Sequence, residues 1–315
     1  MKKGLLILGL LGLAISSLFI GVQSIAVTDL FSLSETQQLV LWSTRVPRTV
    51  SLIIAGATSS VCGLIMQHLT QNKFVSPTTA GTMDSARLGI LIAMVFFPNS
   101  SIFSRSLVAF LFAFLGTLVF IQLIQRLPQK NQVMVPLIGL MFGNIVGSIV
   151  TFFAYQLQVI QNMTAWLQGN FATISRGGYE LVYLTIPLLM IAYFYAYHFT
   201  IAGMGKDMAT SVGLNYQGVQ LFGLGIVALA SSIILVTIGG LPFLGVIVPN
   251  IVSLYFGDQM KGTLWVAAGA GSCFLLVCDI LARVLIQPYE IPVSLVVGVI
   301  GSIIFILLLL KGAKG

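Results

Sequence analysis

The chain has 315 residues, of which 57% are apolar and only 7% charged, and its mean hydropathy is +1.03. A soluble domain is about half apolar and about a quarter charged, so this composition excludes a soluble globular protein. It predicts an all-α transmembrane helical bundle in a single domain, residues 1–315. The net charge of +7 would suggest a nucleic-acid ligand in a soluble protein, but here the basic residues stand singly at the ends of apolar runs. We assign them to membrane orientation and expect no nucleic-acid partner.

Ten apolar runs are predicted to be membrane spans, because about 20 apolar residues cross the hydrocarbon layer. The first follows Lys2-Lys3 and is expected to be retained. A cleaved signal peptide is the alternative, since Ser24-Ile25-Ala26 offers a small-x-small cleavage pattern. The predicted spans are Gly4–Val22, Val46–His68, Thr79–Phe97, Ser106–Gln125, Met134–Leu157, Leu181–Phe199, Gly218–Ile238, Leu241–Phe256, Thr263–Ile286 and Pro292–Leu310.

The distribution of Lys and Arg orients these spans, because cytoplasmic loops retain positive charge. With the N-terminus inside, every lysine is cytoplasmic, and the arginines outside are Arg45, Arg48, Arg105, Arg176 and Arg283. Both termini are therefore predicted to be cytoplasmic. No stretch matches GxxxxGK[ST], so the chain has no nucleotide-binding loop of its own. Another subunit or an ion gradient would have to drive uphill transport.

The eighth span is predicted to be short and broken. The stretch Gly239–Tyr255 carries Pro242 and Pro249 inside an apolar run, and a proline in a helix interior costs about 3 kcal/mol. Two prolines in one apolar run therefore predict a broken helix.

Three arginines are predicted to be outward cations. Arg45 and Arg48 open the second span and share one helix face, where such a pair can clamp carboxylates. Asp279 and Arg283 form an i,i+4 pair near the outer end of the ninth span, and Glu290 follows in the next turn. An acidic docking partner or an anionic substrate fits this arrangement. The alternative is a set of snorkelling arginines that anchor helix ends.

Asp84 and Arg87 form a charged pair in the third span. Their i,i+3 spacing lets them pair and offset a cost of about 2.5–3.5 kcal/mol each at mid-membrane depth. Two alternatives stay open for them: a structural ion pair near the membrane edge, or a lining of the transport pathway.

The internal segment Gly203–Gln217 has short helical stretches punctuated by glycines. It offers Met204, Met208, Val212 and Leu214 toward the cytoplasm. Exposed apolar residues on a connection between spans predict a protein contact, with a flexible connector as the alternative.

The sequence predicts no catalytic site, metal site or cofactor. His68 and His198 stand at span ends, and no HExxH or Ser/His/Asp arrangement lies at membrane depth, so an enzyme is not expected. Cys62, Cys273 and Cys278 have no metal-binding or redox spacing and are expected to be packing residues.

Taken together, these motifs resemble the permease subunits of ABC importers for iron–siderophore complexes, haem and cobalamin, over nearly the whole chain. The resemblance is carried by Arg45-Val46-Pro47-Arg48, Gly56-Ala57 through Gly63 and Gln67, Asn72 to Pro77, Ala209-Thr210-Ser211-Val212-Gly213-Leu214, Pro242-Phe243-Leu244-Gly245-Val246-Ile247-Val248-Pro249, Cys278-Asp279-Ile280-Leu281-Ala282-Arg283 and Pro288-Tyr289-Glu290-Ile291-Pro292.

The resemblance implies ten spans, a homo- or heterodimer of permease subunits with the pathway on its axis, and two separate cytoplasmic ATPase subunits. It also implies that Arg45, Arg48 and Arg283 salt-bridge glutamates of an extracytoplasmic siderophore-binding protein. The coupling segment Gly203–Gln217 would sit in a cleft of the ATPase. The implied coupling residues are Gly203, Lys206, Met208, Ala209, Val212, Gly213 and Leu214, and the implied gating residues are Asn72, Lys73, Phe74 and Val75 with Asn131, Gln132 and Val133.

Three departures from the commonest family pattern point to one branch. Many members have Pro-His-Ile-Val-Arg where this chain has Pro249-Asn250-Ile251-Val252-Ser253, and Lys73 stands in place of a usual proline. In the third span, Thr82–Arg87 replaces a plainer Gly/Ala-rich stretch. Within the family pattern, the break at Pro249, beside Asn250, is expected to be a moving part of the transport pathway. These variants resemble the branch for catecholate-type siderophores such as enterobactin, anguibactin and petrobactin. The resemblance thus predicts a permease in the bacterial cell membrane that moves a ferric siderophore by alternating access. A haem or cobalamin importer, an ion-coupled secondary transporter with Asp84 as its membrane carboxylate, and a structural membrane subunit are the alternatives.

Overall fold

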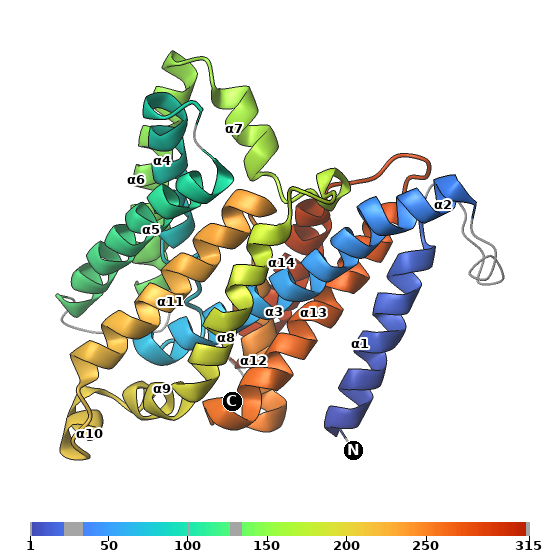
Figure 1. Ribbon diagram of the computed structural model, residues 1–315. Helices are drawn as coiled ribbons and strands as arrows, with labels where there is room; N and C mark the ends of the chain where they lie inside the picture. Colours follow the sequence, from blue (N-terminus) through green and yellow to red (C-terminus); the bar gives the residue numbers. More distant parts are fainter. Residues whose placement is uncertain (1, 22–33, 100, 127–133, 313–315) are drawn as a thin grey trace.

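The computed structural model describes residues 2–21, 34–99, 101–126 and 134–312, which form a bundle of helices (Figure 1). Within these residues the β-type pairing consists of one isolated parallel bridge between Gln168 and Gly240. The prediction of an all-α bundle is therefore confirmed for the part of the chain that the structure describes.

The helices differ in length. Those of 13 or more residues are α1 (Lys2–Phe19), α3 (Val46–Thr70), α4 (Thr82–Phe96), α5 (Ile102–Gln125), α6 (Met134–Gln156), α11 (Tyr216–Thr237), α12 (Leu244–Phe256), α13 (Met260–Val284) and α14 (Val293–Gly312). The short ones are α2 (Glu35–Val40), α7 (Ile160–Leu167), α8 (Thr185–Phe194), α9 (Ala196–Gly203) and α10 (Lys206–Ser211), with a π-helical turn at Leu41–Arg45 and 3₁₀ turns at Phe171–Thr173 and Glu180–Leu184.

Each of the ten predicted spans contains a helix. Six helices of the described chain are long and apolar enough to cross a membrane, and the pair Glu180–Phe194 and Ala196–Gly203, bent by 60°, would make a seventh. Gly4–Phe19 and Leu244–Phe256 are shorter apolar helices, and α4 has 15 residues. The positions of the helices agree with the sequence, while the count of ten complete crossings stays a prediction.

Helix α3 is the centre of the bundle and packs against α11, α12 and α13. Glycines let it approach its neighbours closely: a Cβ on Gly56 would lie 2.5 Å from the Gly271 oxygen of α13, and a Cβ on Gly63 would lie 1.8 Å from the Gly245 oxygen of α12. Gly56 and Gly63 are two helical turns apart and share one face. Lipid gives apolar helices no hydrophobic drive to associate, so close contact between small residues stabilises this arrangement.

Helix α12 is the predicted short, broken span. Pro249 lies in its interior and has no N–H, so the carbonyl four residues earlier, that of Gly245, lacks an intrahelical partner. This carbonyl is the one that packs against Gly63. Before the helix, Gly239 has φ 101° and Phe243 has φ 61°, a left-handed conformation that is unusual for a bulky residue. The interruption before α12 therefore lies at Gly239–Phe243.

The helix that contains the second span begins earlier than predicted. Ser34 is the N-cap, and its hydroxyl accepts the N–H of Gln37 at 3.3 Å. From Glu35 the helix continues through the π-helical turn Leu41–Arg45 into α3. The stretch Glu35–Val40 is largely polar and has no apolar periodicity, so the sequence did not indicate a helix there.

Pro47 therefore lies inside a continuous helix, although the predicted second span begins only one residue before it, at Val46. Its missing N–H leaves the carbonyl of Ser43 without an intrahelical partner. That carbonyl accepts the backbone N–H of Arg176 at 3.0 Å. Just before the proline, the N–H of Val46 bonds to the carbonyl of Leu41, five residues back. The π-helical turn thus connects α2 to α3 without a break in the helix before Pro47.

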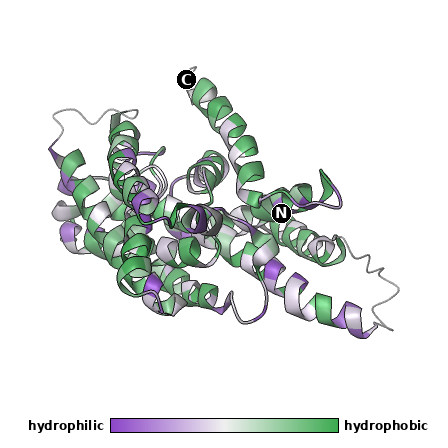
Figure 2. Ribbon diagram, turned by 90° about the horizontal axis from the view of Figure 1, so that it is seen from above, coloured by the Kyte–Doolittle hydropathy of each residue, from purple (hydrophilic) through white to green (hydrophobic). Residues whose placement is uncertain are grey.

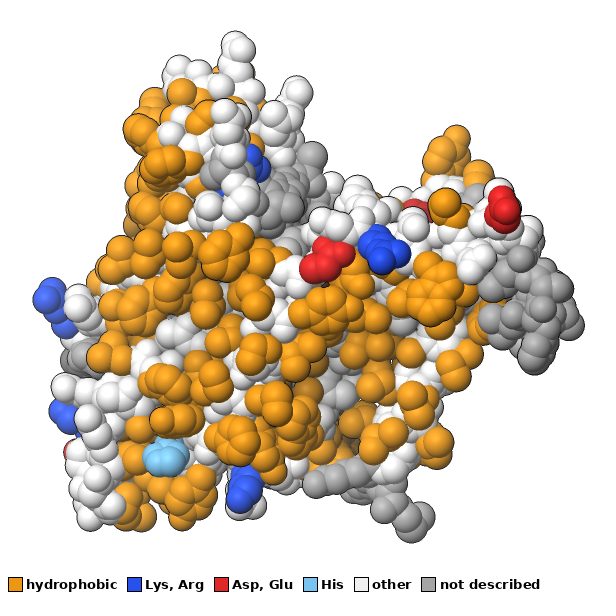
Figure 3. Space-filling model, viewed as in Figure 1, with side chains coloured by type: hydrophobic (Ala, Val, Ile, Leu, Met, Phe, Trp, Pro, Cys, Tyr) orange, Lys and Arg blue, Asp and Glu red, His pale blue; other side chains and the backbone are white. Residues whose placement is uncertain are grey.

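The surface of the bundle is largely apolar. In Figure 3, hydrophobic side chains cover most of the face; one acidic and one basic group lie near its centre, and most other charged side chains lie toward its margins. The view from above shows apolar residues on most helices (Figure 2). Helices α6 and α14 expose rows of large apolar side chains, among them Ile145, Ile149 and Phe152 on α6 and Leu295, Val299 and Ile303 on α14. These surfaces suit lipid or another membrane helix.

Candidate functional site

Asp279 holds the cluster of arginines that the sequence predicts at the outer surface. Arg48 donates from Nε and Nη2 to Asp279 Oδ1 at 2.9 and 2.7 Å, and from Nη1 to Glu290 Oε2 at 2.6 Å. Arg283 donates from Nη2 to Asp279 Oδ2. The predicted i,i+4 pair between Asp279 and Arg283 is therefore present, and Asp279 also joins it to α3.

The same cluster contacts the end of α1. Arg45 Nη1 donates to the carbonyls of Leu18 and Phe19 at 2.7 and 3.2 Å, and Arg283 Nη1 donates to the carbonyl of Ile20 at 2.6 Å. The last carbonyls of a helix have no intrahelical partners and carry partial negative charge, so guanidinium groups stabilise them. These two arginines fix α1 against α3 and α13.

The prediction that the arginines are outward cations is wrong for the structure as it stands. Arg45, Arg48 and Arg283 are only 6%, 8% and 4% exposed, because their partners on α1 and α13 cover them. They do line, with Glu290 and Phe171, a pocket of about 300 Å³. The Nε of Arg283 is buried there without a hydrogen-bond partner. Their role in docking stays a prediction.

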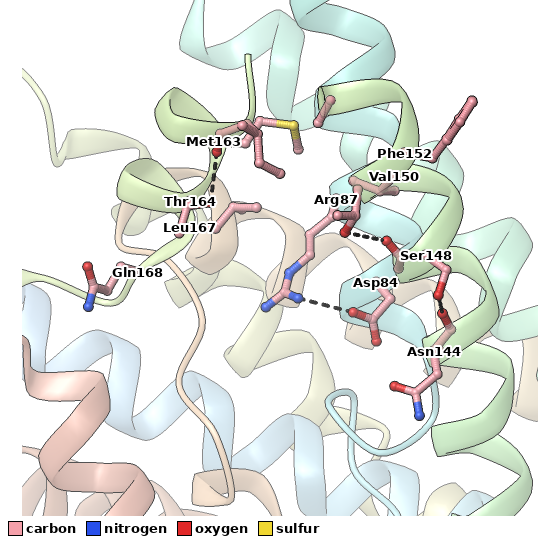
Figure 4. A pocket seen from close by; sticks show the side chains of 15 residues that line it. Asp84, Arg87, Asn144, Ser148, Val150, Phe152, Met163, Thr164, Leu167 and Gln168 are labelled. Atoms are coloured by element: carbon pink, nitrogen blue, oxygen red, sulfur yellow. Dashed lines mark hydrogen bonds and ion pairs between the residues drawn. The ribbon is translucent and has the colours of Figure 1, made fainter. Parts of the chain in front are cut away.

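Asp84 and Arg87 line a second, larger cavity of about 890 Å³ between α4, α6 and α7. Arg87 Nη1 donates to Asp84 Oδ1 at 3.2 Å, so the predicted i,i+3 pair is formed. Both side chains are partly exposed to the cavity, and Figure 4 shows them pointing into it. The pair therefore belongs to a hollow rather than to a packed core.

The turn that was predicted to be an inner gate, Asn72–Val75, follows α3. The side-chain oxygen of Asn72 accepts the backbone N–H of Phe74 at 2.9 Å, which stabilises a tight turn. Val75 is buried. The ring of Phe74 packs edge-on against that of Phe305 in α14, with 5.8 Å between the ring centroids. The turn is thus packed between helices.

Lys73 ties this turn to α12 and to the connection after it. Its Nζ lies 3.2 Å from Asp258 Oδ2 and 3.1 Å from Ser253 Oγ, and Ser253 donates to Asp258. Asn250 Nδ2 donates to the carbonyl of Lys73 at 2.6 Å. Burial, the largest single influence, would raise the pKa of Asp258, but the hydrogen bonds from Ser253 and Lys73 and the charge of Lys73 together lower that pKa.

The second predicted gating turn, Asn131, Gln132 and Val133, lies outside the described residues. Its arrangement relative to the first turn therefore stays a prediction.

The coupling segment lies at the end of the bundle opposite α7 (Figure 1). The predicted coupling residues Gly203, Lys206, Met208, Ala209, Val212, Gly213 and Leu214 span the end of α9, helix α10 and the turn after it. Met204, Met208 and Val212 are exposed, as predicted. Ala209 is buried, and Leu214 packs against the core. Leu214 thus differs from the prediction, because the chain turns back toward α11 there.

Several polar residues of these sites were not predicted as functional. Asp258 and Ser253 complete the Lys73 cluster, and Asn144 and Gln168 line the Asp84 cavity. Lys73 and Ser253 are 180 residues apart, so no local pattern brings them together. The available signal was weak: each is a polar residue in or beside an apolar run. Among the described residues, no group of three or more His, Cys, Asp or Glu side chains could hold a metal ion.

Fold and sites together define a polytopic helical transport protein. A model of the FecCD transport family matches residues 6–311, and the chain belongs to this family. It is 50% identical over 311 residues to the petrobactin import system permease protein YclN of Bacillus subtilis, covering 99% of this chain and 98% of that one. It is 38% identical over 309 residues to the ferric-anguibactin transport system permease protein FatD of Vibrio anguillarum, covering 98% of each.

A solved structure shows the same fold. It is an inward-facing conformation of a proposed metal-chelate type ABC transporter, with a TM-score of 0.83, 23% sequence identity, and coverage of 99% of this chain and 100% of that one. The whole length of the described bundle therefore has a counterpart in a known transporter fold.

Proposed function

We propose that the chain is the permease subunit of an ATP-binding-cassette importer that moves a ferric siderophore of the catecholate type into the cytoplasm. The observation that carries the proposal is the similarity over almost the full length to permeases named for petrobactin and anguibactin import. Asn250 and Lys73, the residues that set this chain apart from the commonest family pattern, meet in one hydrogen bond, which supports a shared role for them.

ATP hydrolysis belongs to separate cytoplasmic subunits in this proposal. The support is the exposed apolar set Met204, Met208 and Val212 beside the short helix α10. An aqueous environment disfavours such a patch, so a protein partner that covers it stabilises it. The last turn of α9, which leads into this patch, packs against the inner end of α3: a Cβ on Gly203 would lie 3.0 Å from the His68 ring. A displacement of α10 by the ATPase would therefore also move the adjoining end of α3.

The inner turn with Lys73 is proposed as the cytoplasmic gate. Its contacts are polar: Ser253 and Asp258 lie at the end of α12 and just after it, and Asn250 lies one turn earlier in the helix. Such contacts can break and re-form at modest cost as the part of α12 after Pro249 moves, whereas the contact between Gly63 and Gly245 holds the start of α12 against α3. Alternating access then includes motion of the last turns of α12.

An extracytoplasmic binding protein is proposed to dock over the pocket lined by Arg45, Arg48 and Arg283. The pocket already pairs arginine with the carboxylate of Glu290 at its rim. A glutamate from a binding protein would offer the same chemistry and would compete with Glu290 for Arg48. Docking would in this way loosen the contact between α3 and the segment after α13.

The second permease subunit, identical or paralogous, is proposed to pack on the exposed apolar faces of α6 and α14. Both termini are proposed to lie in the cytoplasm of a bacterial cell, with the protein in the cell membrane. Lys2, Lys206 and Lys261 would then all lie inside, in agreement with the retention of positive charge there.

Competition uptake tests the substrate class. A strain that lacks this permease and carries it back on a plasmid is expected to take up ⁵⁵Fe-petrobactin, with competition by unlabelled catecholate chelates. Ferric hydroxamates, haem and cobalamin are expected not to compete. Competition by haem or cobalamin alone would assign the chain to another substrate of the family.

A further inference from the structure

A large cavity among the membrane helices combines apolar side chains with several polar and charged ones. It has a volume of about 890 Å³, and its lining includes the charged pair Asp84 and Arg87 and the polar side chains of Asn144, Ser148, Thr151, Thr164 and Gln168. Figure 4 shows the labelled lining residues on α4, α6, α7 and the segment after α7. Polar groups inside a membrane protein are costly, and a water-filled cavity or substrate path is where they occur.

Small residues on helix α6 leave room for this cavity. Gly143, Asn144, Gly147, Ser148 and Thr151 recur at intervals of three and four residues and form one strip of small and polar side chains. A Cβ on Gly143 would lie 2.6 Å from Asp84 Oδ2, and one on Gly147 would lie 3.8 Å from Asp84 Oδ1. The glycine strip therefore gives the Asp84 carboxylate its place beside α6.

Arg87 is incompletely paired. Its Nη1 donates to Asp84, while its Nε is buried without a hydrogen-bond partner. A guanidinium has five N–H donors, and a buried donor that is left unpaired costs about 1–3 kcal/mol. The Arg87 side chain as a whole is 39% exposed, so an oxygen-bearing anion in the cavity can accept charge-assisted hydrogen bonds from its accessible terminal N–H groups.

The other polar side chains divide into donors and acceptors. The hydroxyls of Ser148, Thr151 and Thr164 donate to the carbonyls four residues back in their own helices, at 2.7–2.8 Å. Their oxygens can therefore only accept from a ligand. The amide groups of Asn144 and Gln168 can donate. Arg87 is thus the cationic donor of the cavity, flanked by two neutral amides.

We propose that this cavity is a transient binding site for an anionic oxygen chelate of iron(III), in which Arg87 contacts a carboxylate or catecholate oxygen of the chelate. Asn144 and Gln168 orient the ligand. Asp84 neutralises the charge of Arg87 when the cavity is empty. It also lowers the affinity of Arg87 for the anion, so that the chelate is released to the cytoplasm. The inference rests on the proposed function and assigns the substrate contact within this subunit.

Equilibrium dialysis of the purified permease–ATPase complex with ⁵⁵Fe-petrobactin tests the site. Arg87→Gln is expected to raise the Kd about ten-fold or more, and Arg87→Lys, which keeps the charge, by about three-fold. Asp84→Asn is expected to lower the Kd several-fold, because Arg87 then has no competing carboxylate. Arg126→Gln, the same change at the inner end of α5 and outside the cavity, should leave the Kd unchanged.

The opposite direction of the two cavity variants is the decisive result, since a purely structural ion pair would make both variants bind less. Equal Kd values for wild type and Arg87→Gln, a raised Kd for Asp84→Asn, or cellular uptake without measurable binding to the complex would overturn the inference. Thermal unfolding of each variant verifies that it is folded. If the wild-type importer takes up no ferric siderophore in cells, the proposed function itself fails, which is a different outcome.

Discussion

The carbonyl oxygen of Gly245 lies against the Cα of Gly63, where a Cβ would stand 1.8 Å from it. Pro249 removes the N–H that would otherwise bond this carbonyl, so the break in α12 and the glycine in α3 belong to one contact. The short, broken helix is thereby held at the centre of the bundle.

Replacing Gly63 by alanine is expected to lower the thermal unfolding midpoint of the purified protein. The added methyl group cannot fit, and overpacking of this kind costs about 1–3 kcal/mol. Gly9→Ala is the matched control, because a Cβ there meets nothing within 4 Å; alanine is the better helix former, so its midpoint should stay or rise. An unchanged midpoint for Gly63→Ala would show that α3 and α12 are not in contact.

Replacing Asp279 by asparagine is expected to destabilise the protein strongly. Asp279 is fully buried and pairs with both Arg48 and Arg283, and removal of one partner of a buried pair costs about 3–5 kcal/mol. The readout is the amount of folded protein in membranes and its unfolding midpoint in detergent. Glu35→Gln, at an exposed helix start, should behave as wild type, and equal stability of the two variants would contradict the described cluster.

The link between Lys73 and Asp258 is expected to depend on pH. The pKa of Asp258 is lowered in the folded protein, so its contribution to stability is present above the ordinary carboxyl pKa, about 3.9, and is lost as the pH falls through the lower folded value. Unfolding midpoints of wild type and Asp258→Asn should therefore differ at neutral pH and converge as the pH falls below the lowered pKa of Asp258 in the folded protein. A difference that persists unchanged at acid pH would argue against the ion pair.

A charged residue on the coupling segment is expected to uncouple the transporter. Met208→Asp should leave the permease folded, because Met208 is exposed, and should reduce uptake about ten-fold or more by disfavouring an apolar contact with the ATPase. Met208→Leu keeps an apolar side chain and serves as the control. Leu214→Asp should act differently and lower stability as well, because Leu214 packs against the core. Normal uptake by Met208→Asp would refute the coupling role.

The sequence predicted the helices well and their contacts poorly. Apolar runs have a clear period and length, so all ten positions hold helices. By contrast, the i,i+3 spacing of Arg45 and Arg48 shows that they share a face but not what that face covers. Their partners, Leu18 on α1 and Asp279 on α13, come from distant parts of the chain, so the burial of both arginines could not be foreseen.

The sequence likewise could not predict the distant contacts of two polar sites, the cavity around Asp84 and Arg87 and the turn with Lys73. Asp84 and Arg87 are close in sequence, and their pairing was predicted from spacing alone. The cavity around them was not, because it depends on how α6 and α7 pack beside α4. The bond from Asn250 to Lys73 joins residues 177 positions apart. Both residues were noted as departures from a family pattern, but only the folded chain shows that they are partners.

The most direct test of the central claim is ⁵⁵Fe-petrobactin uptake into vesicles that contain this permease. The complete importer, with its ATPase subunits and binding protein, is predicted to accumulate iron when ATP is present inside, and to stop when the ATPase subunits cannot hydrolyse ATP. Accumulation by the permease alone, driven by an ion gradient and insensitive to ATP, would contradict the account and identify the chain as a secondary transporter.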